Sequence, residues 1–83
     1  MNNLRCLVID DEPLAIDIIE NYLDRLGNVE ATRCENAIEA LKLMRTASFD
    51  IIFLDIEMPL LTGLDFLNSL ANPPAIIITT AYR

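Results

Sequence analysis

Three aspartates have the residue type and the spacing to hold a metal ion. Asp10 and Asp11 follow the short run 4–9, which is apolar except for Arg5, and Asp55 follows the apolar run 51–54. Short apolar runs that stop abruptly at acids are typical of buried parallel strands whose carboxyl ends meet solvent. Neighbouring strands lie about 4.8 Å apart, so the ends of these two would gather three carboxylates in one crevice.

Three carboxylates at such a separation repel one another, so a bound cation would stabilise the arrangement. Two unit charges 4 Å apart repel by about 1 kcal/mol in water and by about 4 kcal/mol at a partly screened site. The chain has no histidine, and oxygen ligands alone favour Mg²⁺, with Mn²⁺ as a second possibility, over zinc. Because Mg²⁺ keeps open positions that a phosphoryl oxygen can take, the crevice is suited to phosphate chemistry.

Each acid also has a simpler interpretation when taken alone. Asp10 and Asp11 could cap a following helix, and Asp55 could merely end a strand. Taken together they favour a site, because each lies at the end of a strongly apolar strand. In an open α/β sheet, ligands bind beyond such strand ends where the chain order reverses.

The elements that would position these acids alternate along the chain. Pro13 suits the first turn of a helix that Gly27 ends, and Asn36 with Glu39 forms a capping box at the start of the next. Apolar residues at helical spacing mark the expected buried face of the first helix. These are Leu14, Ala15, Ile18, Ile19, Tyr22, Leu23 and Leu26. The expected strands are 4–9, 29–34, 51–54 and 75–79, with helices at 13–26, from 37 onward and at 64–70.

Alternating strands and helices predict right-handed crossovers and a parallel sheet covered on both faces. We therefore expect a three-layer α/β fold of the flavodoxin-like type with strand order 2-1-3-4. In that order, the strands that end in acids are neighbours at the point where ligands bind.

Length and charge exclude several classes of protein. The 83 residues, of which 53% are hydrophobic, fit one compact domain over 1–83. Thirteen acids against six bases give a net charge of −7, which opposes contact with nucleic acid. No apolar stretch approaches the roughly 20 residues of a membrane span, and no leader pattern opens the chain. Cys6 and Cys34 are too few for a disulfide framework, so we expect a cytoplasmic protein.

These motifs together resemble a response-regulator receiver domain of two-component signalling. The matching segments are Leu-Val-Ile-Asp-Asp-Glu-Pro at 7–13, the run 51–59, Gly63, and Thr-Thr-Ala at 79–81. The resemblance implies that Asp55 accepts a phosphoryl group from a histidine kinase. It also implies that Asp10 and Asp11 hold Mg²⁺, with Asp55 completing the acidic ligands.

The resemblance assigns five further residues. The main-chain carbonyl of Glu57 would be another metal ligand, and Thr80 would be the switch hydroxyl that turns toward the phosphoryl group. Ala81 matches the small residue beside the site, while Pro59 and Gly63 would shape the loop after the phosphoacceptor. The ordinary preference of proline and glycine for turns would also account for Pro59 and Gly63.

Thr79 lies one residue away from the position of the switch hydroxyl. Without the resemblance, Thr79 and Thr80 would both be taken as β-branched residues that finish a strand. Tyr82 does not align with the switch aromatic residue of the family.

The sequence departs from the family after the run 75–79. Receivers have a fifth strand that carries a lysine, and they have two further helices. The one lysine here, Lys42, belongs to the second helix. We therefore expect an incomplete receiver that lacks the fifth strand and the last two helices. Its fourth strand would be an exposed sheet edge, which favours a homodimer, a segment swap or instability.

The opening Asp-Glu-Pro-Leu-Ala at 11–15 and the ending Thr-Thr-Ala-Tyr at 79–82 look most like receivers joined to LytTR-type DNA-binding domains. The parent protein would then be a transcriptional regulator. Its DNA contacts would belong to the output domain, since the acidic receiver repels phosphate.

Other functions stay open from the sequence. A Mg²⁺-dependent phosphatase resembling the haloacid-dehalogenase enzymes would also use Asp55 as nucleophile, but it needs a second aspartate where Glu57 stands. A nucleotide-binding half-domain lacks a glycine-rich loop, because Gly27 and Gly63 are the chain's two glycines. A purely structural interaction domain would bind no Mg²⁺. We expect a phosphoacceptor signalling domain and not a turnover enzyme.

Overall fold

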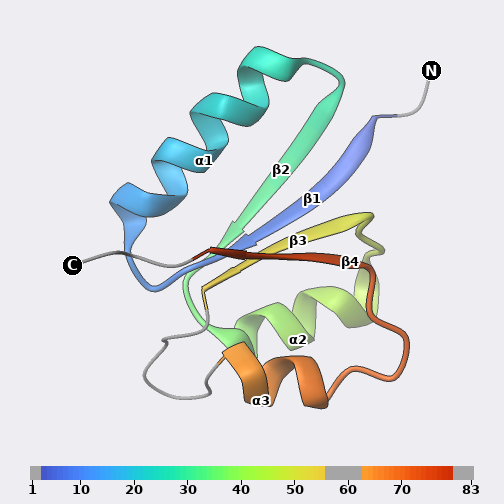
Figure 1. The fold of residues 1–83 in the computed structure, drawn as a ribbon. Helices are drawn as coiled ribbons and strands as arrows, with labels where there is room; N and C mark the ends of the chain where they lie inside the picture. Colours follow the sequence, from blue (N-terminus) through green and yellow to red (C-terminus); the bar gives the residue numbers. More distant parts are fainter. Residues whose placement is uncertain (1–2, 56–62, 80–83) are drawn as a thin grey trace.

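Strands and helices alternate along the chain in the computed structural model (Figure 1), which describes residues 3–55 and 63–79. This order matches the expected one. The third strand extends to include Asp55, and the third helix begins and ends earlier than the expected 64–70. The elements are β1 (Leu4–Ile9), α1 (Pro13–Leu26), β2 (Val29–Cys34), α2 (Ala37–Thr46), β3 (Ile51–Asp55), α3 (Gly63–Asn68) and β4 (Ala75–Thr79).

The four strands form one parallel sheet in the order β2-β1-β3-β4, as predicted. Figure 1 shows α1 over one face of this sheet and α2 with α3 over the other, so the described residues form three layers. Because all strands run the same way, β1 and β3 end side by side at one edge of the sheet, where Ile9 pairs with Leu54.

Alternation along each strand divides the core into two clusters. On the α1 side, Cys6 and Val8 pack with Ile16 and Leu23 of the helix. The cluster beneath α2 and α3 is larger, and its buried members are Leu7, Ile9, Cys34, Ala37, Ala40, Ile52, Leu54 and Phe66. Both cysteines, Cys6 and Cys34, are buried and free.

The buried face of α1 differs from the expected one. Ile16, which the apolar pattern left out, is fully buried, whereas four residues of the expected face are exposed. The helix packs against β1 and β2, so the side of it that turns away from these strands meets solvent. Helical spacing alone could not decide between two apolar sides. The exposed residues are Leu14, Ile18, Tyr22 and Leu26, of which Leu26 is 74% exposed.

The helix ends follow their sequence signals. The side chain of Asn36 accepts a hydrogen bond from the backbone N–H of Glu39 at 2.8 Å, which confirms Asn36 as the N-cap of α2. The Glu39 carboxylate accepts from the side-chain amide of Asn36 at 3.5 Å rather than from its backbone N–H. After α1, Gly27 and Asn28 both adopt positive φ, of 73° and 56°. This turn directs the Asn28 carbonyl to accept a hydrogen bond from the N–H of Leu4 at 2.9 Å, which aligns β2 beside β1.

Asp50 joins the starts of three strands. Its carboxylate accepts a hydrogen bond from the N–H of Arg5 at 2.9 Å, and its own N–H donates to the Arg5 carbonyl at 2.7 Å. Its carbonyl accepts from the N–H of Ala75 at 3.3 Å. The carboxylate therefore closes the β1–β3 ladder at the end of the sheet opposite the three aspartates.

We expect Asp50→Ala to lower the free energy of unfolding by about 1 kcal/mol, since it removes one hydrogen bond to a charged acceptor at an exposed position. Urea unfolding followed by circular dichroism measures this. Asp24→Ala, at an exposed position on α1, is the matched control and should change stability by less than about 0.5 kcal/mol. Equal effects of the two substitutions would contradict the role of Asp50.

In the part of the chain that the structure describes, no helix has the length and apolar character needed to cross a membrane.

Candidate metal and phosphoryl site

The structure brings Asp10, Asp11 and Asp55 together at the carboxyl end of the sheet. One carboxylate oxygen from each lies within 4.8 Å of the others. Asp10 follows β1 directly and Asp55 is the last residue of β3, so the pairing of these two strands produces the cluster. The spacing of two acidic strand ends in the sequence was therefore sufficient to find these three residues.

Backbone hydrogen bonds fix Asp10 in place. Its carboxylate accepts from the N–H of Glu12 at 2.9 Å, and its own N–H donates to the carbonyl of Cys34 at 3.1 Å. Glu12, and neither aspartate, occupies the N-cap position of α1, and within residues 3–55 and 63–79 no side-chain cap hydrogen bond is formed there. Helix capping thus does not account for the pair of aspartates after β1.

The acids of the cluster differ in exposure. Asp10 and Asp55 are each only 6% exposed, whereas Asp11 is exposed. Burial raises the pKa of Asp10, and the nearby carboxyl groups of Asp55 and Asp11 raise it further. The N–H of Glu12 acts in the opposite direction. Two buried carboxylates and one exposed carboxylate thus leave a local excess of negative charge that a cation would neutralise.

The donor set fits a hard divalent cation. All three side chains offer carboxylate oxygens, which are the ligands that Mg²⁺ and Mn²⁺ prefer. Asp11 is exposed, so the cluster is accessible to solvent on its side. Asp10, Asp11 and Asp55 are the residues that would hold such an ion.

Four other predicted site residues are not described by the structure. Glu57, Pro59, Thr80 and Ala81 lie outside the described residues, so the structure does not place them. Gly63 is the first residue of α3.

A further residue, one position away from the expected switch hydroxyl, lies beside the cluster. Thr79 is the register partner of Asp55 across β3 and β4. Its hydroxyl oxygen is buried and has no hydrogen-bond partner among the described residues. Strand register would have found it, but register depends on the pairing of β3 with β4, which a single sequence does not state.

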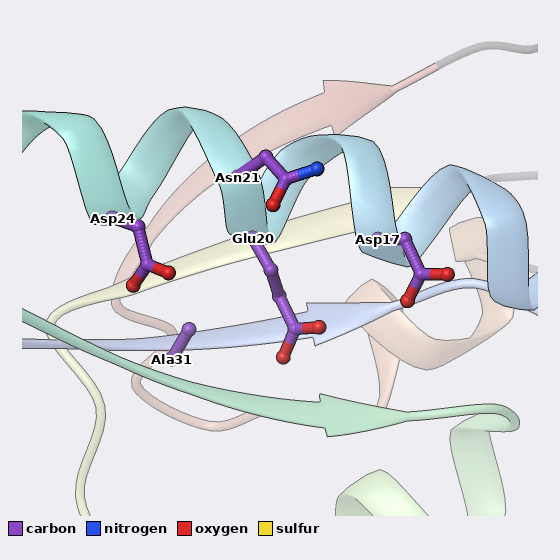
Figure 2. A pocket seen from close by; sticks show the side chains of 5 residues that line it. All are labelled: Asp17, Glu20, Asn21, Asp24 and Ala31. Atoms are coloured by element: carbon purple, nitrogen blue, oxygen red, sulfur yellow. The ribbon is translucent and has the colours of Figure 1, made fainter.

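An acidic hollow lies apart from the three-aspartate cluster, between α1 and β2. Figure 2 shows the carboxylates of Asp17, Glu20 and Asp24 pointing from α1 toward the strand that carries Ala31. These acids belong to the polar side of α1.

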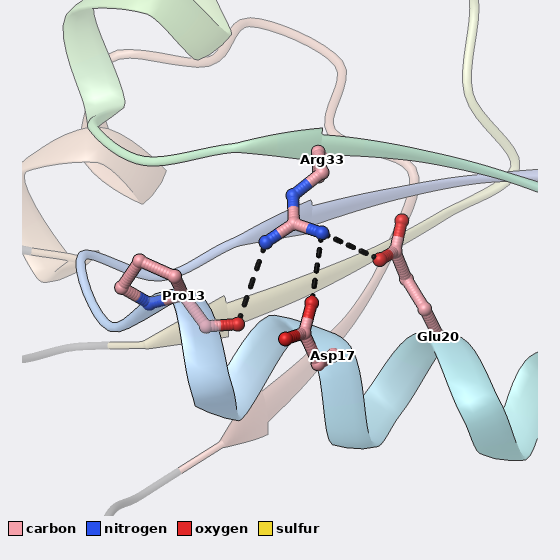
Figure 3. Close-up of polar contacts among 4 residues, drawn as sticks. All are labelled: Pro13, Asp17, Glu20 and Arg33. Atoms are coloured by element: carbon pink, nitrogen blue, oxygen red, sulfur yellow. Dashed lines mark hydrogen bonds and ion pairs between the residues drawn. The ribbon is translucent and has the colours of Figure 1, made fainter.

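Arg33 of β2 partly neutralises this acidic side of α1 (Figure 3). One guanidinium nitrogen lies 2.9 Å from carboxylate oxygens of both Asp17 and Glu20, and the other donates to the Pro13 carbonyl at 3.4 Å. The hydrogen bond that Arg33 donates to the Asp17 carboxylate is the main cause of the raised pKa of Arg33. Because these groups are exposed or half-exposed, the ion pairs contribute little to stability, as is usual on a surface.

The raised pKa of Asp10 predicts how the stability of the metal-free protein depends on pH. An acid with a raised pKa in the folded state stabilises folding below its ordinary pKa near 4, and this stabilisation is lost as the pH rises through the raised value. We expect Asp10→Asn to reduce that loss in urea unfolding measured from pH 4 to pH 7.

The effect of Mg²⁺ on the stability of the same two proteins is a second test of the role of Asp10. At a hundred times its dissociation constant, a bound ion stabilises the folded state by about 2.7 kcal/mol. We expect Mg²⁺ to stabilise the parent chain at pH 7 and to stabilise the Asp10→Asn variant much less. Equal stabilisation of both proteins would show that Asp10 is not a ligand.

The chain is similar to known proteins in sequence and in fold. Residues 6–83 match the family model described as the response regulator receiver domain. An uncharacterized response regulatory protein of Yersinia pestis is 39% identical over 83 residues. The transcriptional regulatory protein BtsR of Escherichia coli is 33% identical over 82 residues. Each alignment covers 95% of this chain and 34% of the relative, so the chain spans about a third of the length of these curated relatives.

Among solved structures, the response regulator TrrA of Thermotoga maritima in complex with Mg²⁺ and BeF is 36% identical, with a TM-score of 0.86. The alignment covers 95% of this chain and 70% of TrrA. TrrA is also similar, with a TM-score of 0.82, in its complex with the histidine kinase ThkA.

Proposed function

The chain belongs to the response regulator receiver domain family, and from this membership we propose that Asp55 accepts a phosphoryl group from the phosphohistidine of a histidine kinase. The observation that carries the proposal is the convergence of three carboxylates at the ends of β1 and β3. Asp55, buried at the last position of β3, is the nucleophile in this arrangement.

The reaction is a displacement at phosphorus. A carboxylate oxygen of Asp55 forms a bond to phosphorus as the bond from phosphorus to the histidine nitrogen breaks, and the histidine leaves with the electron pair. Most of the work of such a site is positioning and electrostatic stabilisation. The backbone contacts of Asp10 hold one carboxylate at a fixed place beside Asp55, and Asp11 is the solvent-exposed acid of the cluster.

Mg²⁺ is part of this proposal, with Mn²⁺ as its substitute. Bound by Asp10, Asp11 and Asp55, with the carbonyl of Glu57 as a further ligand from the family resemblance, it would neutralise charge on the transferring phosphoryl group. The complex of TrrA with Mg²⁺ and BeF supports this assignment.

The proposed partners follow from the relatives. TrrA binds the histidine kinase ThkA, so a histidine kinase is the expected phosphodonor. BtsR is a transcriptional regulatory protein of about three times this length, which supports control of transcription by an output domain. We propose an output domain of the LytTR type, with Thr80 as the switch hydroxyl that links phosphorylation to it. The acidic receiver itself would not contact DNA.

Location and self-association complete the proposal. We place the domain in the cytoplasm, where a reducing environment keeps thiols such as Cys6 and Cys34 free. A homodimer or a segment swap would use β4, because Ile77 and Ile78 are 45% and 44% exposed on this outer strand of the described sheet.

Intact mass spectrometry tests the function directly. We expect the chain incubated with Mg²⁺ and acetyl phosphate to gain the mass of one phosphoryl group and to remain unmodified when a chelator removes the ion. A parallel assay with an aryl phosphate separates the module from a phosphatase. Repeated turnover of the aryl phosphate would favour the enzyme, whereas a single stoichiometric modification supports the receiver.

A further inference from the structure

Thr79 lies in line with the acids of the site. β3 and β4 pair in parallel with Phe53 opposite Ile77 and Asp55 opposite Thr79. Side chains two residues apart on a strand share a face, so Asp55 and Thr79 lie on the face of the sheet that carries Phe53. Phe53 packs with the cluster under α1. Thr79 is thus the neighbour of Asp55 on that face.

Asp10 occupies the other flank of Asp55. Val8 pairs with Phe53, and the β1–β3 register ends at Ile9 and Leu54, one residue before the two aspartates. Since β3 lies between β1 and β4, Asp55 stands between Asp10 on one side and Thr79 on the other. The first neighbour is an acceptor when ionised, and the second carries a hydroxyl that can donate.

The hydroxyl of Thr79 is otherwise unexplained. Its oxygen is buried and has no hydrogen-bond partner among the described residues. A buried polar atom without a partner destabilises the folded state, and valine, with the same shape, would fill this place in a strand without that penalty. The two preceding residues of β4, Ile77 and Ile78, are apolar. The strand therefore does not otherwise need polar side chains at this end.

We propose that Thr79 is a positioning residue for the phosphoacceptor, whose hydroxyl donates a hydrogen bond to the carboxylate of Asp55 on the flank away from Asp10. An ionised carboxylate offers about four acceptor sites, so this bond is compatible with the other interactions of Asp55. Asp10, Asp11 and one oxygen of Asp55 would hold the ion, and the second oxygen of Asp55 would accept the bond from Thr79.

This role depends on the proposed function and differs from that of Thr80. Thr80 is assigned to the switch that follows phosphorylation. Thr79 would act before it, by fixing the orientation in which Asp55 binds the ion and attacks phosphorus. Positioning of this kind affects both ion affinity and the rate of phosphoryl transfer.

Thr79→Val tests the proposal with an isosteric loss of the hydroxyl, and Thr79→Ser restores a hydroxyl. We expect Thr79→Val to slow the gain of mass from acetyl phosphate about tenfold, the effect of losing one hydrogen bond to a charged group. Thr79→Ser should remain within about threefold of the parent. Thr32→Val is the matched control, since Thr32 is a half-buried threonine of β2, away from Asp55, and its rate should be unchanged.

A thermal melt with and without Mg²⁺ supplies a readout independent of phosphorylation. Without the ion, Thr79→Val should melt at the same temperature as the parent or higher, because an unpartnered hydroxyl has been replaced by a methyl group. With Mg²⁺, its midpoint should rise less than that of the parent or of Thr79→Ser. A merely structural threonine would not combine these two results.

The outcomes separate the two proposals. If the parent is phosphorylated and Thr79→Val reacts at the same rate, the role of Thr79 is overturned while the receiver function stands. If the parent gains no phosphoryl group, the proposed function fails, and the Mg²⁺ melts decide the positioning role of Thr79. Equal Mg²⁺ shifts in the parent and in Thr79→Val would then overturn it.

Discussion

Asp55→Asn should abolish the gain of a phosphoryl group, with a fall in rate of more than about a thousandfold, as expected when a nucleophile is removed. The amide of asparagine carries no charge and is a poor nucleophile toward phosphorus. Its shape nevertheless matches that of aspartate, so the packing at the end of β3 is retained. Intact mass recorded over time with Mg²⁺ and acetyl phosphate measures the loss.

The fold of this variant can be checked independently. Asp55 is a buried carboxyl group beside Asp10 and Asp11, so replacing it with a neutral amide should leave the metal-free protein at least as stable as the parent. Asp24→Asn, at an exposed aspartate of α1, should be phosphorylated at the parent's rate. A variant Asp55→Asn that gains the same mass as the parent would place the phosphoacceptor elsewhere and refute the proposed function.

Phe66→Ala should cause the largest loss of stability among single substitutions considered for this chain. Phe66 is fully buried on α3 and packs in the cluster that includes Ile52 and Leu54 of β3. Truncation of a buried phenylalanine costs about 3–5 kcal/mol. Whole domains are stable by only about 5–15 kcal/mol, so we expect a substantial fraction of the variant molecules to be unfolded.

Urea unfolding followed by circular dichroism measures this effect, and Leu26→Ala is its control. Leu26 is a large apolar residue that is 74% exposed at the end of α1, so its truncation should change stability by less than about 0.5 kcal/mol. If the two substitutions cost the same, Phe66 does not anchor α3 to the sheet.

Much of the fold and of the acidic cluster could be predicted from the sequence. Strands 4–9 and 51–54 are recognisable because their apolar runs stop at acids, and the alternation of strand and helix then requires a parallel sheet. In such a sheet the carboxyl ends share one edge, so Asp10, Asp11 and Asp55 had to meet once β1 and β3 were neighbours. Asn36 was equally predictable, because a helix N-cap is a local signal.

The features that the sequence did not determine depend on which surfaces face each other. Apolar residues lie on more than one side of α1, and only the packing of this helix on β1 and β2 selects Ile16 for burial and leaves Leu14 exposed. Arg33 pairs with Asp17 because α1 packs beside β2. Neither the helical pattern of one segment nor the strand pattern of the other indicates this contact.

Thr79 shows the same limit at the site itself. A threonine at the end of a β-branched run is an ordinary strand residue until β4 is placed beside β3 in a particular register. The sequence determines which side chains alternate along a strand, because the period of two is local. Register between strands arises from tertiary packing, and it alone decided that Thr79, whose hydroxyl has no partner among the residues described, would lie next to Asp55.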